Sequence, residues 1–512
     1  MVSLLPSSYV ALRPGVVMKK DQNRAVLFKD FDQISASTSM AYIGTIEALF
    51  LALSSRGMAA HEATHYVTKI LRLPKEMVTH AIEQMVAVLG PAYLSFTNEA
   101  AGPPTPPGPY NPRDFIFTTQ DIEVRAHFET PVVLVFSLTR VCGRQCIYCY
   151  AGANYTRAKI MTVRSPVPWL SLAEEAGDLG VLQVHLTGGE PFLYADILPL
   201  VRILVRNGAT PFLSTKAYLP PDVCRQLADT GLQEMQVSLD SPFPDLTDRL
   251  TGVPGTHDAI IDTIRNLHQV GIRTRVNAVV TSLNVRALPQ LITLLGELGV
   301  SRLIFAPYTF SLGRHSDDLY ISDDDYVFVQ NLANTASADL DLGVDAFTRY
   351  EISPPTTPAT VKPSPYQWKT QLVCAGGMYG FAIGPTGDVA ICERLLDVPG
   401  ASLGNVVTHG GLREFWDSPD VRRFVSPPRE AFIGTACESC AIFESCETTL
   451  GRCYVRAYDS YGKLFAPDPL CPAVQRSLEV ERGDVHSTKD DAGQKGGVVD
   501  GPLRVGRTHG PR

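Results

Sequence analysis

The sequence predicts an α/β protein in which a parallel sheet covered by helices forms the middle of the chain, with a smaller unit on either side. Between residues 115 and 314, apolar strand-like runs alternate with amphipathic helical stretches, as in βα units. Residues 100–112 are so rich in proline that they can form neither helix nor strand ladder, which marks a stiff linker. Seven of the eleven cysteines lie between Cys374 and Cys471, which marks a separate C-terminal unit.

The overall composition is that of a globular protein. A length of 512 residues leaves room for several domains, each with its own core. The net charge of -8 argues against a nucleic-acid backbone as the main partner. No apolar run reaches membrane-spanning length, and the start lacks the basic and apolar regions of a secretory signal. We therefore expect a cytoplasmic protein with neither a nucleic-acid nor a membrane partner.

The N-terminal unit, residues 1–95, is predicted to hold short strands followed by three helices. Strand-like runs at 16–19 and 25–28 precede helical segments at 40–53, 59–71 and 74–89. In the third helical segment, Ile82, Met85 and Leu89 recur at helical spacing, and Pro74 suits the first turn of a helix.

One motif in this unit suggests a different chemistry. His61-Glu62-Ala63-Thr64-His65 matches H-E-x-x-H, the zinc-protease helix motif, with both histidines on one helical face. The predicted helix is short and no third ligand stands out nearby in the sequence. We therefore interpret the match as a surface helix rather than a zinc site.

The central region, residues 115–345, follows the linker at 96–114 and contains six strand-like runs. These are residues 132–138, 184–186, 211–213, 235–239, 274–280 and 303–306. In parallel sheets of this kind, active-site groups gather at the carboxyl ends of the strands. Cys224 lies in an amphipathic stretch and is interpreted as a packing residue.

Three cysteines follow the first run at once. Cys142, Cys146 and Cys149 have the spacing C-x3-C-x2-C, which is too close for a set of disulfides. Thiolates at this density suit a soft metal, and iron–sulfur clusters take cysteine ligands at such spacings. A [4Fe–4S] cube held by only three cysteines leaves one iron open for another ligand. The alternative is a zinc site with a fourth ligand from elsewhere.

With Tyr148 just before its last cysteine, this loop resembles that of the radical S-adenosylmethionine (SAM) enzymes. In that family the open iron chelates the amino and carboxylate groups of SAM, and reduction cleaves SAM to a 5′-deoxyadenosyl radical. The resemblance implies that the central region is a partial (β/α)6 radical SAM barrel. It also implies a catalytic role for Cys142, Cys146 and Cys149.

The same resemblance implies a set of SAM-binding residues at successive strand ends. Gly188-Gly189-Glu190-Pro191 looks like the family motif that binds the SAM amino group. Ser238 matches a contact to the SAM ribose, and Asn277 is a further candidate. The full set implied for SAM is Tyr148, Gly188, Gly189, Glu190, Ser238, Asp240 and Arg249, the last of these on the SAM carboxylate.

The C-terminal cysteines, within residues 366–480, resemble the SPASM domain, which binds two auxiliary [4Fe–4S] clusters. The resemblance assigns Cys374, Cys392 and Cys453 to the first cluster. It assigns four to the second: Cys437, Cys440, Cys446 and Cys471. Cys446 and Cys453 stand farther apart than the family pattern has them. A pair of structural zinc sites is the alternative, and residues 481–512 are predicted to be a disordered tail.

The strand-then-helix pattern of the N-terminal unit looks like a winged-helix domain that recognises precursor peptides. Taken together, the chain resembles the peptide maturases of ribosomally synthesised, post-translationally modified peptides. The implied reaction removes hydrogen from a precursor-peptide residue and leads to a thioether or a carbon–carbon or carbon–oxygen cross-link. The implied cofactors are SAM and three [4Fe–4S] clusters. The implied partners are a precursor peptide held by its leader and a reductant such as flavodoxin or ferredoxin.

Two other functions stay open at this point. The first is maturation of an active-site residue in a folded protein, as in the sulfatase maturases. The second is a peptide-binding protein whose iron–sulfur clusters are only structural. The predicted leader-binding unit argues against the first, and the cysteine triad beside Gly188-Gly189-Glu190 argues against the second.

Overall fold

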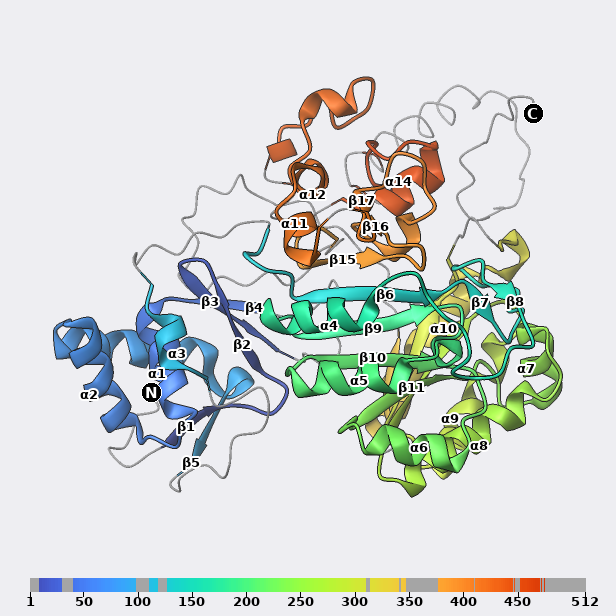
Figure 1. Cartoon of the computed structure of the whole chain (residues 1–512), viewed down its shortest axis with the longest axis horizontal. Coiled ribbons are helices and arrows are strands. Elements are labelled where there is room, and N and C mark those ends of the chain that lie inside the picture. The colour runs from blue at the N-terminus through green and yellow to red at the C-terminus, as the bar shows by residue number, and fades with distance from the viewer. Residues whose placement is uncertain are drawn as a thin grey trace, which may run out of the picture.

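A computed structural model describes residues 9–29, 40–97, 110–117, 127–309, 314–339, 342–346, 376–408, 410–444, 446, 452–469, 471 and 474. Cys374, the predicted tail at 481–512 and residues 98–109 of the predicted linker lie outside these ranges. In Figure 1 the N-terminal unit lies at the left, the central α/β region at the lower right and the C-terminal unit above it.

All six predicted strands are present, and they form one continuous parallel arrangement. Each begins and ends within a few residues of the predicted run. In sheet order they are β6 (Val133–Thr139), β9 (Gln183–Gly188), β10 (Thr210–Thr215), β11 (Glu234–Ser238), β12 (Arg273–Val280) and β13 (Arg302–Pro307).

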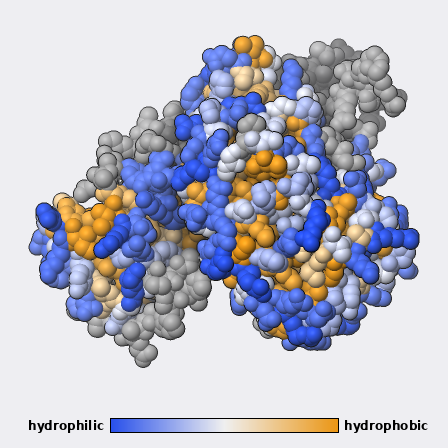
Figure 2. All heavy atoms as spheres, in the orientation of Figure 1, coloured by the Kyte–Doolittle hydropathy of each residue, from blue (hydrophilic) through white to orange (hydrophobic). Residues whose placement is uncertain are grey.

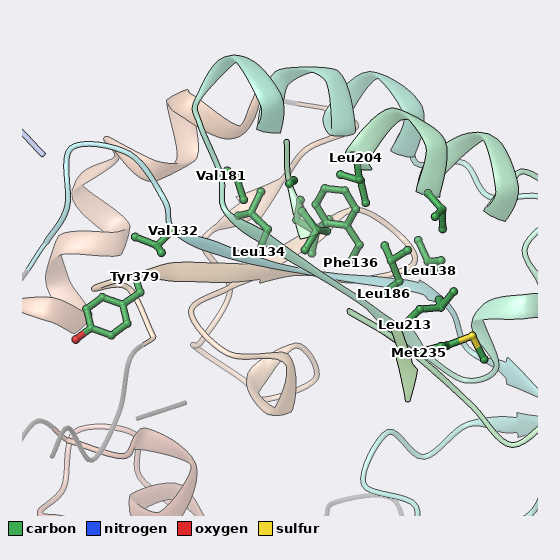
Figure 3. Packing of buried hydrophobic residues seen from close by; sticks show 14 of the residues in the cluster. Val132, Leu134, Phe136, Leu138, Val181, Leu186, Leu204, Leu213, Met235 and Tyr379 are labelled. Atoms are coloured by element: carbon green, nitrogen blue, oxygen red, sulfur yellow. The ribbon is translucent and has the colours of Figure 1, made fainter. Parts of the chain in front are cut away.

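Helices connect these strands and cover one face of the sheet (Figure 1). They are α4 (Trp169–Asp178), α5 (Ile197–Arg206), α6 (Pro221–Ala228), α7 (Pro244–Thr251), α8 (Thr256–Gln269), α9 (Leu288–Glu297) and α10 (Asp323–Asp339). On β6 the helix-facing residues Leu134, Phe136 and Leu138 are fully buried, while the residues between them are only half-buried. Figure 3 shows Phe136 directed at these helices, beside Leu204 of α5.

The alternation of burial along the strands shows which residues lie on the inner face of the sheet. Successive strand residues point to opposite faces, so the half-buried set lines the concave inner face of the sheet. On β9 that set includes His185 and Thr187, and on β12 it includes Asn277. Polar residues inside apolar strands therefore mark the inner face, where a ligand can lie.

The sheet extends beyond the six predicted strands at both ends. β14 (Gly343–Ala346) pairs in parallel with β13. At the other end β15 (Gly380–Ile383), from the C-terminal unit, pairs in parallel with β6, followed by antiparallel β16 (Asp388–Ala390) and β17 (Gly404–Asn405). A Cβ on Gly380 would lie 1.6 Å from the Val133 carbonyl oxygen, so only glycine allows this pairing. The C-terminal unit is thus joined to the first strand of the central region.

Short helices complete the C-terminal unit. They are η6 (Glu393–Leu395), α11 (Leu412–Trp416), α12 (Pro419–Val425), η7 (Arg429–Phe432) and α14 (Tyr454–Tyr461). Trp416 is fully buried, and its indole N–H donates to the Phe128 carbonyl at 2.8 Å. This bond ties α11 to the segment that leads into β6.

The described residues of the N-terminal unit form three helices and two small antiparallel sheets. The helices are α1 (Thr45–Ser54), α2 (Ala60–Leu71) and α3 (Lys75–Tyr93). The first sheet has the order β2 (Val17–Asp21), β3 (Arg24–Phe28) and β4 (Met40–Ile43), and the second pairs β1 (Tyr9–Leu12) with β5 (Leu94–Thr97). The winged-helix likeness of this unit stays a prediction.

The prediction of a helix from residue 40 was wrong over its first four residues. Residues 40–43 form β4, and all four are buried. Val26 and Tyr42 on one face of the sheet pack into the central core, while Leu27 and Ile43 on the other face pack against the helices of the unit. A segment buried on both faces is apolar throughout, and its periodicity cannot separate strand from helix.

The surface of the N-terminal unit carries apolar side chains. Tyr66 and Ile70 on α2 and Met77 on α3 are exposed, and Figure 2 shows hydrophobic surface over this unit at the left. In the part of the chain that the structure describes, no helix is both long enough and apolar enough to cross a membrane.

Candidate active site

A cavity of about 350 Å³ opens at the carboxyl ends of the parallel strands. The first cysteine loop, the loop after β9 and the ends of β10 to β13 form its wall. Nine predicted residues line it: Cys142, Cys146, Tyr148, Cys149, Gly188, Gly189, Glu190, Ser238 and Asn277. Residues scattered over more than 130 positions of sequence therefore meet around one space.

Hydrogen bonds to its backbone hold the cysteine loop from two sides. The Gln145 N–H donates to the carbonyl of Thr251, at the end of α7, at 2.8 Å. The Arg314 guanidinium donates to the carbonyls of Cys146 at 3.1 Å and Ala153 at 2.8 Å. These contacts fix the loop through its backbone.

Gly188 and Gly189 are required by packing against the cysteine loop. A Cβ on Gly189 would lie 2.0 Å from the Val141 carbonyl oxygen, and one on Gly188 would lie 2.5 Å from that of Thr139. This close approach allows the Gly189 N–H to donate to the Thr139 carbonyl at 2.6 Å, and the Glu190 N–H to the Val141 carbonyl at 2.9 Å. The two glycines therefore allow the loop after β9 to bond directly to the segment that begins the cysteine loop.

Glu190 is buried, and it lines the cavity. It accepts hydrogen bonds from the Thr215 hydroxyl at 2.8 Å and from the backbone N–H groups of Phe192 and Lys216, each at 3.2 Å. Burial raises the pKa of Glu190, and these donors oppose the rise. A carboxylate can accept about four hydrogen bonds, so these three leave room for an ammonium donor.

Asp240 lies behind the cavity wall rather than on it. It is fully buried and accepts hydrogen bonds from the Tyr148 hydroxyl and from the Val279 N–H, the latter at 2.8 Å. The Lys216 ammonium lies 3.4 Å from its carboxylate and 5.5 Å from the centre of the Tyr148 ring. Asp240 thus orients two side chains that do line the cavity.

Arg249 does not reach the cavity. The structure places it, exposed, on α7, and it is not among the residues that line the cavity. The segment around Arg249 instead contributes a backbone hydrogen bond to the site, because the Leu250 carbonyl accepts the Ile147 N–H at 3.0 Å. The predicted contact of Arg249 with the SAM carboxylate gains no support from this geometry.

The chemistry of the three thiols fits an iron–sulfur cluster. Burial raises the pKa of Cys142 to about 12, and the Glu190 carboxylate contributes to this rise. Burial also raises the pKa of Cys146. Buried thiols of this kind stay protonated unless a positive ion stabilises the thiolate, which coordinated iron does. Cys142, Cys146 and Cys149 share one cavity with the volume to hold such a group.

Among the described residues, no group of three or more His, Cys, Asp or Glu side chains is arranged as the ligands of a single metal ion. A four-iron cube spaces its ligands more widely than one ion does. His61 and His65 are exposed on α2, and the Glu62 carboxylate accepts the Ala59 N–H at 3.3 Å. Glu62 therefore acts as a helix cap in the H-E-x-x-H segment.

The C-terminal cysteines fall into two groups. Burial raises the pKa of Cys392 to about 12, and the neighbouring Cys453 contributes to this rise. Burial likewise raises the pKa of Cys437 to about 11, with contributions from three other cysteines: Cys440, Cys446 and Cys471. Each group matches a predicted cluster, except that Cys374 lies outside the described residues.

A second cavity of about 270 Å³ adjoins the first, between the central region and the C-terminal unit. The two cavities share Tyr150, Ala151, Gly188, Gly189 and Glu393. Tyr150 follows Cys149, Glu393 follows Cys392, and a hydrogen bond joins their side chains. Burial raises the pKa of Glu393, and this hydrogen bond lowers it. The first cysteine loop is thereby linked to the candidate auxiliary site.

Lys216, His185 and Tyr308 are among the wall residues that were not predicted. Lys216 directly follows the last residue of β10. His185 stacks on Phe212 at 4.6 Å, and burial lowers its pKa to about 4, which keeps the imidazole neutral. Tyr308 follows β13 and is buried. His185 is a polar residue inside an apolar strand-like run, and this position could have identified it as a candidate site residue.

Comparison with known proteins decides the family. Residues 136–295 match the model of the radical SAM superfamily, and residues 374–447 match SPASM, an iron–sulfur cluster-binding domain. The chain is a radical SAM enzyme with a SPASM domain. Its cofactors therefore include SAM and [4Fe–4S] clusters, as the sequence predicts.

The similar proteins include peptide-modifying enzymes. The PqqA peptide cyclase of Rhodopseudomonas palustris is 27% identical over 373 residues, which cover 71% of this chain and 93% of the cyclase. The mycofactocin maturase MftC of Mycobacterium tuberculosis is 25% identical over 365 residues, covering 69% and 88%.

A solved structure shares the fold over most of the chain. Streptococcus suis SuiB, bound to its precursor peptide SuiA, superposes with a TM-score of 0.60 at 19% identity. The match covers 90% of this chain and 100% of SuiB, so it extends beyond the central region.

Proposed function

We propose that this radical SAM enzyme is a maturase of a ribosomally made precursor peptide. It removes hydrogen from a residue of the core peptide and leads to a thioether or a carbon–carbon or carbon–oxygen cross-link. The observation that carries the proposal is the single cavity at the strand ends lined by Cys142, Cys146, Cys149 and Glu190. The two curated relatives named above, a peptide cyclase and a maturase, support a peptide as the substrate class.

When bound, the cluster and SAM supply a 5′-deoxyadenosyl radical, which can remove hydrogen from an unactivated carbon. Cys142, Cys146 and Cys149 would hold the cluster. Glu190 would accept a hydrogen bond from the SAM ammonium, and its bond to Thr215 fixes it for that contact. Ser238 and Asn277, partners in register on β11 and β12, would bind the ribose.

Lys216 is a further candidate contact, because it lies on the cavity wall and carries a positive charge. Burial lowers the pKa of Lys216, but the Asp240 carboxylate and the cysteines outweigh this effect, and the net direction is upward. A fixed ammonium beside the cysteine loop suits the SAM carboxylate. We assign it the role that Arg249 was predicted to fill.

The SPASM cysteines would hold two auxiliary clusters, which brings the total to three. Cys392 and Cys453, with Cys374, would hold the first, next to the second cavity. The second cavity adjoins the SAM cavity and would hold part of the core peptide. An external flavodoxin or ferredoxin would supply the electron that starts the reaction.

The N-terminal unit would bind the leader segment as an added strand. The edge of β2 is covered, since the Met18 N–H donates to the Tyr110 hydroxyl at 2.9 Å. We therefore assign the leader to this unit, away from the part of the β2 edge that Tyr110 covers. Tethering the leader there would raise the effective concentration of the core peptide at the cavity.

The test uses the short peptide encoded nearest this chain's gene, made synthetically with and without its leader. Reconstituted enzyme, SAM and a reductant should remove two hydrogen atoms from the full peptide, as mass spectrometry would detect. The core segment alone should react at least about tenfold more slowly, because the tether is missing. Equal rates for both would refute the leader-binding role, and an unchanged mass of both would refute the maturase function.

A further inference from the structure

Three side chains form a hydrogen-bonded chain that starts at the SAM cavity. Tyr308 lines the cavity, and its hydroxyl lies 2.7 Å from Nδ1 of His315. Nε2 of His315 lies 2.9 Å from a carboxylate oxygen of Asp317. The backbone N–H of Ser316 donates to the Tyr308 hydroxyl at 3.0 Å.

The chain runs from the interior to solvent. Tyr308 is 6% exposed as a residue, and the side chains of His315 and Asp317 are 22% and 73% exposed. The rings of Tyr308 and His315 are parallel within 5°, with centres 5.7 Å apart, and Tyr320 packs edge-on against both. The packing holds the hydrogen bonds in line.

The hydrogen bonds of His315 define which of its two ring nitrogens carries the proton. Asp317 accepts a hydrogen bond from Nε2, so the neutral imidazole carries its proton there. Nδ1 is then the acceptor for the Tyr308 hydroxyl proton. The oxygen of Tyr308 accepts a hydrogen bond from the Ser316 N–H and has the capacity to accept a second one.

Formation of the cross-link requires a proton acceptor in the cavity. After hydrogen removal leaves a carbon radical on the peptide, a bond from that carbon to sulfur, oxygen or carbon displaces the hydrogen that the second atom carried. That hydrogen leaves as one proton and one electron. The electron passes to a one-electron acceptor of the iron–sulfur class, which the SPASM domain is built to hold. The proton needs a base on the cavity wall.

We propose that Tyr308, His315 and Asp317 form the relay that takes this proton. The Tyr308 oxygen accepts the proton from the peptide while its own proton moves to Nδ1 of His315. Tyr308 ends neutral, and His315 ends as an imidazolium beside the Asp317 carboxylate, from which the proton reaches solvent. This inference rests on the proposed function, because it assigns a step of that reaction.

Other polar groups on the wall have different partners. Glu190 accepts three hydrogen bonds beside the cysteine loop, and Lys216 is paired with Asp240. His185 lies 2.7 Å from the Gln183 side chain, deep in the sheet. Tyr308 is instead connected, through two hydrogen bonds, to a carboxylate at the surface.

The test compares His315→Gln, Tyr308→Phe and Tyr320→Phe with wild type, using the precursor peptide described above. Glutamine can accept from Tyr308 and donate to Asp317, so it keeps the hydrogen bonds but has no basic nitrogen. Tyr320→Phe keeps the ring packing and lies outside the relay. The measured quantity is modified peptide formed per 5′-deoxyadenosine, in proteins matched for iron content.

We expect the ratio to fall at least about tenfold in His315→Gln and Tyr308→Phe, with 5′-deoxyadenosine still forming. Tyr320→Phe should keep the wild-type ratio. A wild-type ratio in His315→Gln would overturn the relay, because it would show that the hydrogen bonds serve only to hold the loop. If wild-type enzyme leaves the peptide unmodified, the proposed function itself fails, and the relay with it.

Discussion

The contact between the Gly188-Gly189 loop and the cysteine loop gives the most quantitative prediction, the effect of Gly189→Ala. The added methyl carbon would lie 2.0 Å from the carbonyl oxygen and 2.6 Å from the carbonyl carbon of Val141. Both are backbone atoms, so no side-chain rotation can relieve the overlap. The two loops must move apart.

The magnitude follows from what that movement breaks. Overpacking at a tight site costs about 1–3 kcal/mol. The bonds from the Gly189 N–H to Thr139 and from the Glu190 N–H to Val141 are worth about 1 kcal/mol each. We therefore expect Gly189→Ala to lower the free energy of unfolding by about 3–5 kcal/mol.

A matched control lies within the cysteine loop itself. A Cβ on Gly143 would have nothing within 4 Å, so Gly143→Ala should change stability by less than about 0.5 kcal/mol. Denaturant unfolding of the two metal-free variants measures the difference, and iron content after reconstitution measures the effect on the site. A Gly189→Ala variant as stable as Gly143→Ala would refute the argument that packing, rather than ligand approach, requires this glycine.

Two further predictions concern buried charges. Asp240→Asn leaves the buried Lys216 without its carboxylate and should lower the free energy of unfolding by about 3 kcal/mol. The control is Asp262→Asn, in an exposed pair with Arg265, which should change the free energy of unfolding by less than about 1 kcal/mol. Equal effects of the two substitutions would contradict the account. Lys19, buried with its ammonium 2.5 Å from the Gly180 carbonyl, has a pKa that burial lowers to about 8. Because the unfolded chain then binds the extra proton, stability should rise from about pH 8 to pH 10.5, by up to about 3 kcal/mol. Lys19→Met should lack this rise, and an identical pH dependence in both proteins would contradict it.

Much of the central region could be predicted from the sequence because its signals are local. Each predicted apolar run of the central region forms a strand, and the cysteine loop and Gly188-Gly189-Glu190 come at or directly after strand ends. Helical crossovers between parallel strands leave few arrangements, so the residues after successive strands must meet at one edge.

What could not be predicted depends on contacts between distant segments. β15 is a strand because it pairs with β6, more than 240 residues earlier, and β4 is one because both its faces are buried. Arg249 was assigned from its motif alone, but the helix turns its side chain to solvent. The Tyr308–His315–Asp317 chain is built by a loop fold that no periodicity reveals.

The central claim is that Cys142, Cys146 and Cys149 hold the cluster that cleaves SAM. The direct measurement is anaerobic incubation of reconstituted enzyme with SAM and a reductant, followed by assay of 5′-deoxyadenosine. We predict formation by wild type and by Cys224→Ala, whose cysteine is buried in the core away from the cavity, and none by Cys146→Ala. Equal formation by wild type and Cys146→Ala, or none by fully reconstituted wild type, would contradict the account.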